Sequence, residues 1–222
     1  TTGMLPHSFT NYVPDNNGLK TAVCDNLCGA SETRVDEKYT EPEIKVTPNV
    51  MEEGKAETSV EKDLLDEIAD YEKNLYVNSE IVKMIFNNSA LKKLLKDFDE
   101  AVTISIVAKD TTPENASNKL VFDVYVSVDG EDQEHTYFGE NEGKVTVTVP
   151  MSKLDVPVGK RAYVYYVDGD TKTLVDSKYV HGGSTIEFVT DHFSTYEVLV
   201  DDCFDHECSY EADKCTICGA AK

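Results

Sequence analysis

The sequence contains no tryptophan, and no cysteine occurs in the 174 residues between Cys28 and Cys203. The central part of the chain therefore cannot be cross-linked by disulfide bonds and must be stabilised by the burial of apolar side chains. A hydrophobic content of 40% is sufficient for such a core. The large apolar residues are concentrated between about Val60 and Val200, whereas the two polar ends contain all six cysteines. We expect one core with a small cysteine-bearing segment on each side.

Basic residues are also scarce. The chain has 21 Lys and Arg against 42 Asp and Glu, which gives a formal net charge of −21 at pH 7. A surface this acidic repels nucleic-acid phosphates and anionic lipid headgroups, so we expect neither as a partner. The excess of acid is typical of a soluble surface, and the sequence after Asp168-Gly169-Asp170 does not match the calcium loop of an EF-hand.

Long apolar runs are absent as well. No stretch of about 18 apolar residues is present, and no basic segment followed by an apolar one begins the chain. We therefore expect no direct membrane insertion of this segment. Because Thr1 begins in the middle of a motif, we expect the export signal and the anchor of a longer polypeptide to lie outside it.

Changes of composition predict four parts. Residues 1–39 are rich in turn formers and cysteine, and they are expected to form a small repeat unit. Residues 40–57 are mostly acidic and lack periodicity, which predicts a linker. Residues 58–200 carry the core, and residues 201–222 form a Cys/His ribbon-like tail.

Two amphipathic helices are predicted at the beginning of the central module. Thr58 and Glu61 have the spacing of a capping box, and apolar residues at helical spacing continue to Leu75. A second helical stretch is predicted after Asn78-Ser79, with apolar residues on one face, and Asn87-Asn88-Ser89 is a point at which it can be interrupted.

From Val102 onward the apolar period changes from 3.6 to 2, which indicates half-buried strands. Strands are predicted at 102–106, 120–128, 145–149, 162–167, 186–189 and 196–200, with glycine turns between several of them. The resulting fold class is mainly β. We expect an antiparallel β-sandwich with one or two preceding helices, which give it some α+β character, and small loop-rich Cys/His ends.

The tail contains four residues with the spacing of a metal site. Cys203-x2-His206 and Cys215-x2-Cys218 supply three thiolates and an imidazole, a set that suits a structural, tetrahedral Zn²⁺ ion. Such an ion would fold a segment that is too small to bury a core of its own. Disulfides are the alternative, because Cys208 completes an even set of four cysteines, and free thiols are a third possibility.

The N-terminal set is the weaker metal prediction, because His7, Cys24 and Cys28 supply only three ligands. An incomplete site, a site completed by a neighbouring repeat and a Cys24–Cys28 disulfide all remain open.

The sequence contains no evident catalytic centre. Asp191, His192 and Ser194 are close in the chain, but neighbouring strand residues point to opposite faces, and no Gly-x-Ser-x-Gly elbow occurs. His135 and His181 lie near expected turns and are expected to be solvated. The twelve tyrosines are compatible with carbohydrate stacking, although packing in ordinary strands explains them equally.

The stretches 143–150, 162–169 and 186–196, the last of which ends in Thr190-Asp-His-Phe-Ser-Thr-Tyr196, resemble a β module that recurs in large secreted proteins of Gram-positive gut bacteria. The resemblance covers about residues 77–200. It implies an extracellular or cell-wall-associated location and supplies no chemistry.

A second resemblance involves the Cys/His ends. The stretches 7–13, 18–24 and 28–30 resemble a short Cys-containing repeat of the same kind of protein, and the tail is similar to others in it. That repeat commonly carries another cysteine ahead of the glycine, where this chain has Asn16-Asn17-Gly18. These resemblances imply a non-enzymatic structural or adhesive module. A module that binds carbohydrate or a host surface protein is the alternative, and a hydrolase domain ranks third.

Overall fold

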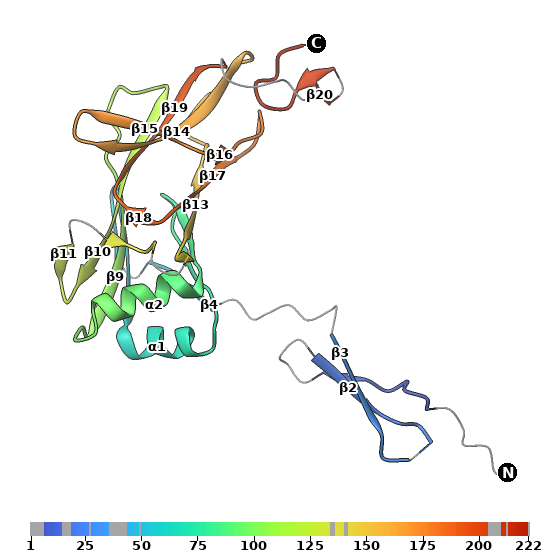
Figure 1. Cartoon of the computed structure of the whole chain (residues 1–222). Helices are drawn as coiled ribbons and strands as arrows, with labels where there is room; N and C mark the ends of the chain where they lie inside the picture. Colours follow the sequence, from blue (N-terminus) through green and yellow to red (C-terminus); the bar gives the residue numbers. More distant parts are fainter. Residues whose placement is uncertain are drawn as a thin grey trace. The chain divides into compact units, whose positions relative to one another are not determined.

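The computed structural model describes residues 7–14, 19–26, 28–35, 44–48, 50–133, 136–139, 142–203, 210–211 and 213–221 (Figure 1). The chain separates into two compact units, Thr1–Glu43 and Ile44–Lys222. The fold is mainly β with antiparallel sheets and two helices, which confirms the predicted fold class.

The first unit is a three-stranded antiparallel sheet formed by β1 (Val13–Pro14), β2 (Leu19–Val23) and β3 (Ser31–Val35). Ala22 and Cys24 are the buried side chains among its described residues. A sheet of this size excludes too little water to be stable through burial alone. The unit therefore needs another source of stability.

The second unit contains two large sheets (Figure 1). In spatial order, the eight-stranded sheet comprises β15 (Thr171–Val175), β14 (Lys160–Asp168), β19 (Thr195–Asp202), β10 (Lys119–Val128), β9 (Thr103–Asp110), β6 (Lys55–Glu61) and β5 (Val50–Glu52), with β11 (Glu131–Gln133) paired to β10. The six-stranded sheet comprises β16 (Ser177–Lys178), β17 (Thr185–Thr190), β13 (Val145–Pro150), β8 (Lys83–Phe86), β7 (Leu75–Asn78) and β4 (Ile44–Val46). Only the β4–β7 pair is parallel among the described ladders.

Two short ladders complete the described strands: β12 (Thr136–Tyr137) with β18 (His192–Phe193), and β20 (Tyr210–Glu211) with β21 (Lys214–Cys215). The large sheets share one apolar core, to which alternate residues of β10 and β13, such as Phe122 and Val147, contribute. Helices α1 (Lys62–Asp70) and α2 (Asn88–Asp97) cover one end of this core with Leu65, Ile68 and Leu94.

The predicted beginning of the first helix is wrong. Thr58 lies in β6 and is 2% exposed, and the helix begins only at Lys62. Ala56, Thr58 and Val60 are buried alternately while their neighbours face outward, so the local period is 2. A buried threonine has the same polar side chain as a helix cap, so the sequence conceals this alternation. The predicted linker 40–57 is also wrong over its described residues, since β4, β5 and the start of β6 lie within it.

The second predicted helix is also too long at its beginning. Its first half is the turn that follows β7 and the strand β8 of the same hairpin, and at this turn Ser79 Oγ accepts a hydrogen bond from the Val82 amide. Helix α2 starts afterwards, and Asn87 is its N-cap, because the Asn87 side chain accepts a hydrogen bond from the Ala90 amide. The Asn87-Asn88 pair therefore begins a helix rather than interrupting one.

A buried tyrosine fixes the point at which the chain crosses from one sheet to the other. Tyr196 is 1% exposed, and its hydroxyl donates a hydrogen bond of 2.7 Å to the carbonyl oxygen of His192. Thr190 Oγ1 lies 2.8 Å from the same hydroxyl. This geometry matches the tyrosine corner of β-sandwich domains. The segment from Thr190, which ends β17, to Tyr196 in β19 therefore has a structural role.

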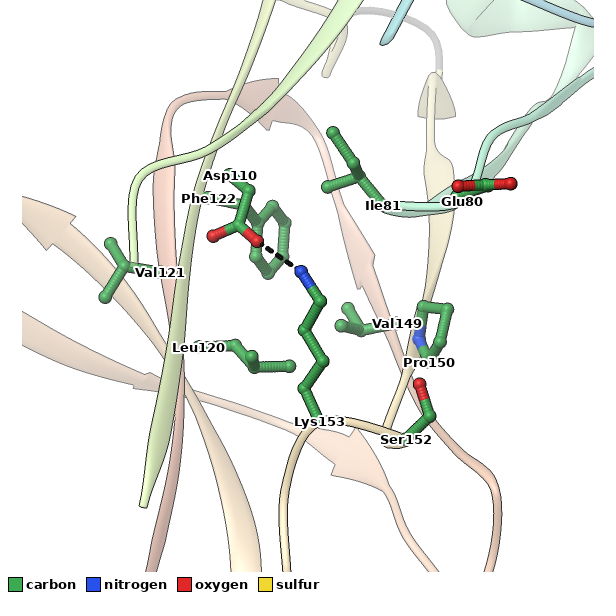
Figure 2. Close-up of a pocket in the computed structure, with 10 residues that line it drawn as sticks. All are labelled: Glu80, Ile81, Asp110, Leu120, Val121, Phe122, Val149, Pro150, Ser152 and Lys153. Atoms are coloured by element: carbon green, nitrogen blue, oxygen red, sulfur yellow. Dashed lines mark hydrogen bonds and ion pairs between the residues drawn. The ribbon is translucent and has the colours of Figure 1, made fainter. Parts of the chain in front are cut away.

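An ion pair joins the two sheets where a cavity of about 40 Å³ lies between them (Figure 2). Lys153, which follows β13, reaches across to Asp110 at the end of β9, with Nζ and Oδ2 2.7 Å apart. Burial acts to raise the pKa of the Asp110 carboxyl, but hydrogen bonds from Lys153 and Thr112 outweigh it and hold the pKa below its usual value. The cavity has room for water but not for an organic ligand.

Removal of the Tyr196 hydroxyl tests the corner. We expect Tyr196→Phe to lower the free energy of unfolding by about 1–3 kcal/mol, because the hydrogen bonds of the hydroxyl with the His192 carbonyl and with Thr190 Oγ1 are both lost. Tyr76, a half-exposed tyrosine in β7, provides the matched control, and Tyr76→Phe should change the same quantity by less than about 0.5 kcal/mol. Urea denaturation of both variants measures the difference, and equal effects would contradict the role assigned to Tyr196.

The Asp110–Lys153 pair predicts a dependence of stability on pH. Because the folded state depresses the pKa of Asp110, the pair stabilises the fold above the unfolded carboxyl pKa of about 3.9, and this contribution is lost as the pH falls through the lower folded value. Asp110→Asn should be less stable than the wild type at pH 7 and closer to it at pH 2–3. Urea midpoints at several pH values measure this, and a constant difference would contradict it.

Candidate metal centre

His7, Cys24 and Cys28 converge in the first unit. One ligand atom from each residue lies within 4.8 Å of the others, and Cys28 Sγ is 3.2 Å from His7 Nδ1. Cys24 directly follows β2, Cys28 precedes β3, and His7 belongs to the segment before β1. The two cysteines therefore lie at the two ends of the β2–β3 connection, and the histidine comes from a separate segment earlier in the chain.

The backbone of that connection holds the two cysteines in place. The Cys24 amide donates a hydrogen bond of 2.8 Å to the carbonyl of Ala30, which closes the turn. Gly29 has a φ of +81°, a conformation that side-chain-bearing residues rarely adopt, so a glycine directly after Cys28 suits this turn.

Asp25 ties the His7 segment to the turn. Its amide donates to the Ser8 carbonyl at 2.8 Å, and its carboxylate accepts hydrogen bonds from the hydroxyls of Ser8 and Thr10 at 2.8 and 3.0 Å. The carboxylate is thus occupied by hydroxyl groups rather than aimed at the cysteines. Asp25 acts as the positioning residue that keeps His7 beside Cys28.

The environment favours the thiolate of Cys24. The hydrogen bond with His7, followed by those with the Ser8 backbone and the Cys28 side chain, lowers the pKa of Cys24 to about 6 despite the burial of the thiol. The thiolate is the form of cysteine that binds metal. Two sulfur atoms and an imidazole nitrogen form a soft donor set, so this group can hold a metal ion.

The tail shows part of the set predicted there. Cys203, Cys215 and Cys218 are described, whereas His206 and Cys208 lie outside the described residues. Cys215 and Cys218 are 2% and 3% exposed. Burial, together with the neighbouring thiols of Cys218 and Cys215, raises the pKa of Cys203 to about 12. Cys203 thus interacts with the thiol of Cys218, and the ligand set predicted for the tail stays a prediction.

Backbone hydrogen bonds attach this tail to the sandwich. The Gly159 amide donates to the Cys218 carbonyl at 2.8 Å, the Cys203 amide donates to the Gly159 carbonyl at 3.1 Å, and the His181 amide donates to the Thr216 carbonyl at 2.8 Å. The His181 ring lies so close to Gly219 that a Cβ at that position would be 2.4 Å from it. His181 is half-buried against the tail, so the expectation that it is solvated is wrong.

Comparison with known proteins identifies no relative. No family model matches the chain, and no curated protein or solved structure matches it. In the part of the chain that the structure describes, no helix is long and apolar enough to cross a membrane.

The Asp191–His192 pair belongs to the tyrosine corner. Asp191 Oδ1 lies 2.9 Å from His192 Nδ1, and the His192 ring packs edge-on against Tyr166 with ring centroids 4.7 Å apart. The hydroxyl of Thr190 is 3.5 Å from the same nitrogen, but it also contacts the His192 carbonyl and the Tyr196 hydroxyl, and Thr190 is 7% exposed. This hydroxyl is therefore held by hydrogen bonds within the tyrosine corner. His135 lies outside the described residues.

A larger hollow lies on the eight-stranded sheet and was not predicted from the sequence. It has a volume of about 470 Å³ and contains Tyr125, Asp123 and residues of β11. The alternation in β10 places Asp123 and Tyr125 on the outer face, but their neighbours across the sheet are set by the register of distant strands. Nothing local in the sequence reveals that register.

The exposed thiol at the N-terminal group gives a direct test of convergence. We expect Zn²⁺ to slow the alkylation of Cys28 by iodoacetamide, because a coordinated thiolate cannot attack the reagent. The protection should disappear in Cys24→Ser, which removes the buried ligand. Mass spectrometry of the tryptic peptide measures the rate, and an unchanged rate in the presence of Zn²⁺ would contradict metal binding by this group.

Proposed function

We propose that this chain is a non-enzymatic structural or adhesive module of a secreted surface protein, in which Zn²⁺ stabilises the small Cys/His unit. The observation that carries the proposal is the convergence of His7, Cys24 and Cys28 in a unit whose described residues bury only Ala22 and Cys24. Metal coordination supplies the stability that such a unit cannot obtain from a core. Two thiolates and an imidazole suit tetrahedral Zn²⁺, and a structural role requires that a donor from outside this group of three fills the fourth position.

The β-sandwich serves as the rigid body of this module. Its shared core and its tyrosine corner make it stable without disulfides, and the net charge of −21 favours solubility and disfavours nucleic acid and anionic lipid as partners. An extracellular or cell-wall location is part of the proposal. It is supported by the resemblance of residues 190–196 to modules of secreted Gram-positive proteins.

The tail adds a second part to the proposal. Cys203, His206, Cys215 and Cys218 would hold a structural Zn²⁺ ion with a closed coordination sphere, which leaves no position for a reactive water. The buried knuckle of Cys215 and Cys218 supports this assignment, because the Gly219 amide donates to the Cys215 carbonyl and turns the chain tightly. Disulfides that include Cys208 are the competing outcome.

Cobalt binding distinguishes the two metal sites. Reduced, metal-free protein should bind Co²⁺ and show a sulfur-to-metal charge-transfer band. Cys24→Ser should remove the part of the band intensity that comes from the N-terminal site. Cys215→Ser should remove the part that comes from the tail. Glu32→Gln is the matched control, because Glu32 lies in the same unit and contacts Tyr12 and Arg34 rather than the metal ligands.

The same samples test whether the metal folds the unit. We expect the backbone amide NMR signals of residues 19–35 to collapse towards random-coil positions after chelation and to disperse again when Zn²⁺ is added. The proposal would be contradicted if the Cys24→Ser variant bound as many metal ions as the wild type. It would also be contradicted if chelation left the NMR signals of residues 19–35 unchanged.

A further inference from the structure

The groove on the eight-stranded sheet lies where its strands separate. Strand β10 pairs with β19 as far as Asp123, which is opposite Thr195, and then continues into the hairpin with β11. On the other side, β14 pairs with β19 as far as Val167 and then continues into the hairpin with β15. The two hairpins diverge beyond the start of β19, and the hollow of about 470 Å³ lies between them.

A row of directly paired residues forms the floor of this groove. Lys109 is opposite Asp123, Asp123 is opposite Thr195, and Thr195 is opposite Val167, so the row crosses four strands. Directly paired residues in a ladder point to the same face. This is the outer face, because the alternate residues Phe122 and Val124 belong to the core. The register of the sheet therefore places these four side chains side by side.

Tyr125 gives the groove a fixed aromatic surface. It lies two residues after Asp123 on the same face, and its cross-strand neighbour Val107 is 1% exposed although it points away from the core. Burial, followed by the charge of Asp132, raises the pKa of Tyr125. The ring is thus packed at its base and half-exposed above.

The polar groups of the groove are available as donors and acceptors. Asp123 Oδ1 accepts a hydrogen bond of 2.7 Å from Thr195 Oγ1, which orients the carboxylate. Gln133 is held through a 2.9 Å hydrogen bond to the Glu131 carbonyl. Within the described part of the chain, Lys109 and Asp132 form no ion pair with each other or with another residue. A ligand can therefore use both charges.

The charges of the groove exclude two classes of ligand. Carboxylates in the groove and a net charge of −21 repel anions. Among the described residues, the carboxylates here do not converge closely enough to hold a metal ion, since the group that does so is His7, Cys24 and Cys28. Of the remaining classes, a neutral, hydroxyl-rich molecule fits these side chains, because hydroxyl groups donate to carboxylates and accept from ammonium and amide groups.

We propose that this groove binds a neutral saccharide, with Tyr125 stacked on a sugar ring and Asp123, Asp132, Lys109 and Gln133 hydrogen-bonded to its hydroxyl groups. The volume lies within the range of about 300–1,000 Å³ that is typical of small-ligand sites. The groove is open to solvent, so a sugar unit within a longer glycan chain can enter it. This inference deepens the adhesive half of the proposed function and rests on it, whereas the metal sites are independent of it.

The test uses the full chain and a panel of neutral oligosaccharides, namely the hexamers of cellulose, mannan and chitin together with lacto-N-neotetraose. Isothermal titration should show binding of at least one of them, and 3′-sialyllactose and a heparin hexasaccharide should bind more weakly. Tyr125→Ala and Asp132→Asn should each weaken binding at least tenfold. Asp132 is exposed, so its substitution tests the groove without endangering the fold.

Matched controls separate the groove from the rest of the surface. Tyr76→Ala alters a half-exposed tyrosine of the other sheet, and Asp63→Asn alters an exposed aspartate of α1, so both should bind as the wild type does. Cys24→Ser should also bind sugar normally, which separates a failure of the metal proposal from a failure of this one.

Three results would overturn the inference. The first is that folded protein binds no neutral oligosaccharide at millimolar concentration. The second is that the groove variants and the control variants lose the same affinity for the sugar. The third is that binding requires added Ca²⁺ and disappears with a chelator. The last result would assign the groove to a cation.

Discussion

The hydrogen bond between the Tyr196 hydroxyl and the His192 carbonyl is the constraint on which the rest of the second unit depends. It lies where the chain leaves the six-stranded sheet and enters the eight-stranded one, and Tyr196 packs there against Phe122 and Phe188, one from each sheet. The corner therefore sets the register of β19. Strand β19 in turn pairs with both β10 and β14, so a shift there would disperse the row of residues at the groove.

The two units solve the problem of stability in different ways. The sandwich buries a continuous core between two sheets and needs no cross-link. The first unit buries two described side chains and gathers His7, Cys24 and Cys28 instead. This division follows the sequence, in which apolar residues and cysteines occupy separate parts. Where the chain is too short to bury a core, it gathers instead a group of side chains that can hold a metal ion.

The sequence predicts the β-rich class and most central strands, because alternation in segments such as 120–128 is a local signal. It fails where a polar residue is buried, as with Thr58, and where a hairpin such as β7–β8 is compatible with helical spacing. The spacing of Cys24 and Cys28 marks them as candidate ligands, but the approach of His7 depends on hydrogen bonds to Asp25. The groove depends on the register of four strands, which only the folded chain defines.

The edges of the two large sheets limit the ways in which copies of this chain can pair with one another. Among the described edge strands, β4, β5, β11 and β16 are two or three residues long, and β15 has five. Such short edges present few unpaired amide and carbonyl groups to a neighbouring copy. Tandem copies on one polypeptide reach a high local concentration, at which long edges would join by strand pairing. In such a series, the short edge strands would keep neighbouring copies from joining through their sheets.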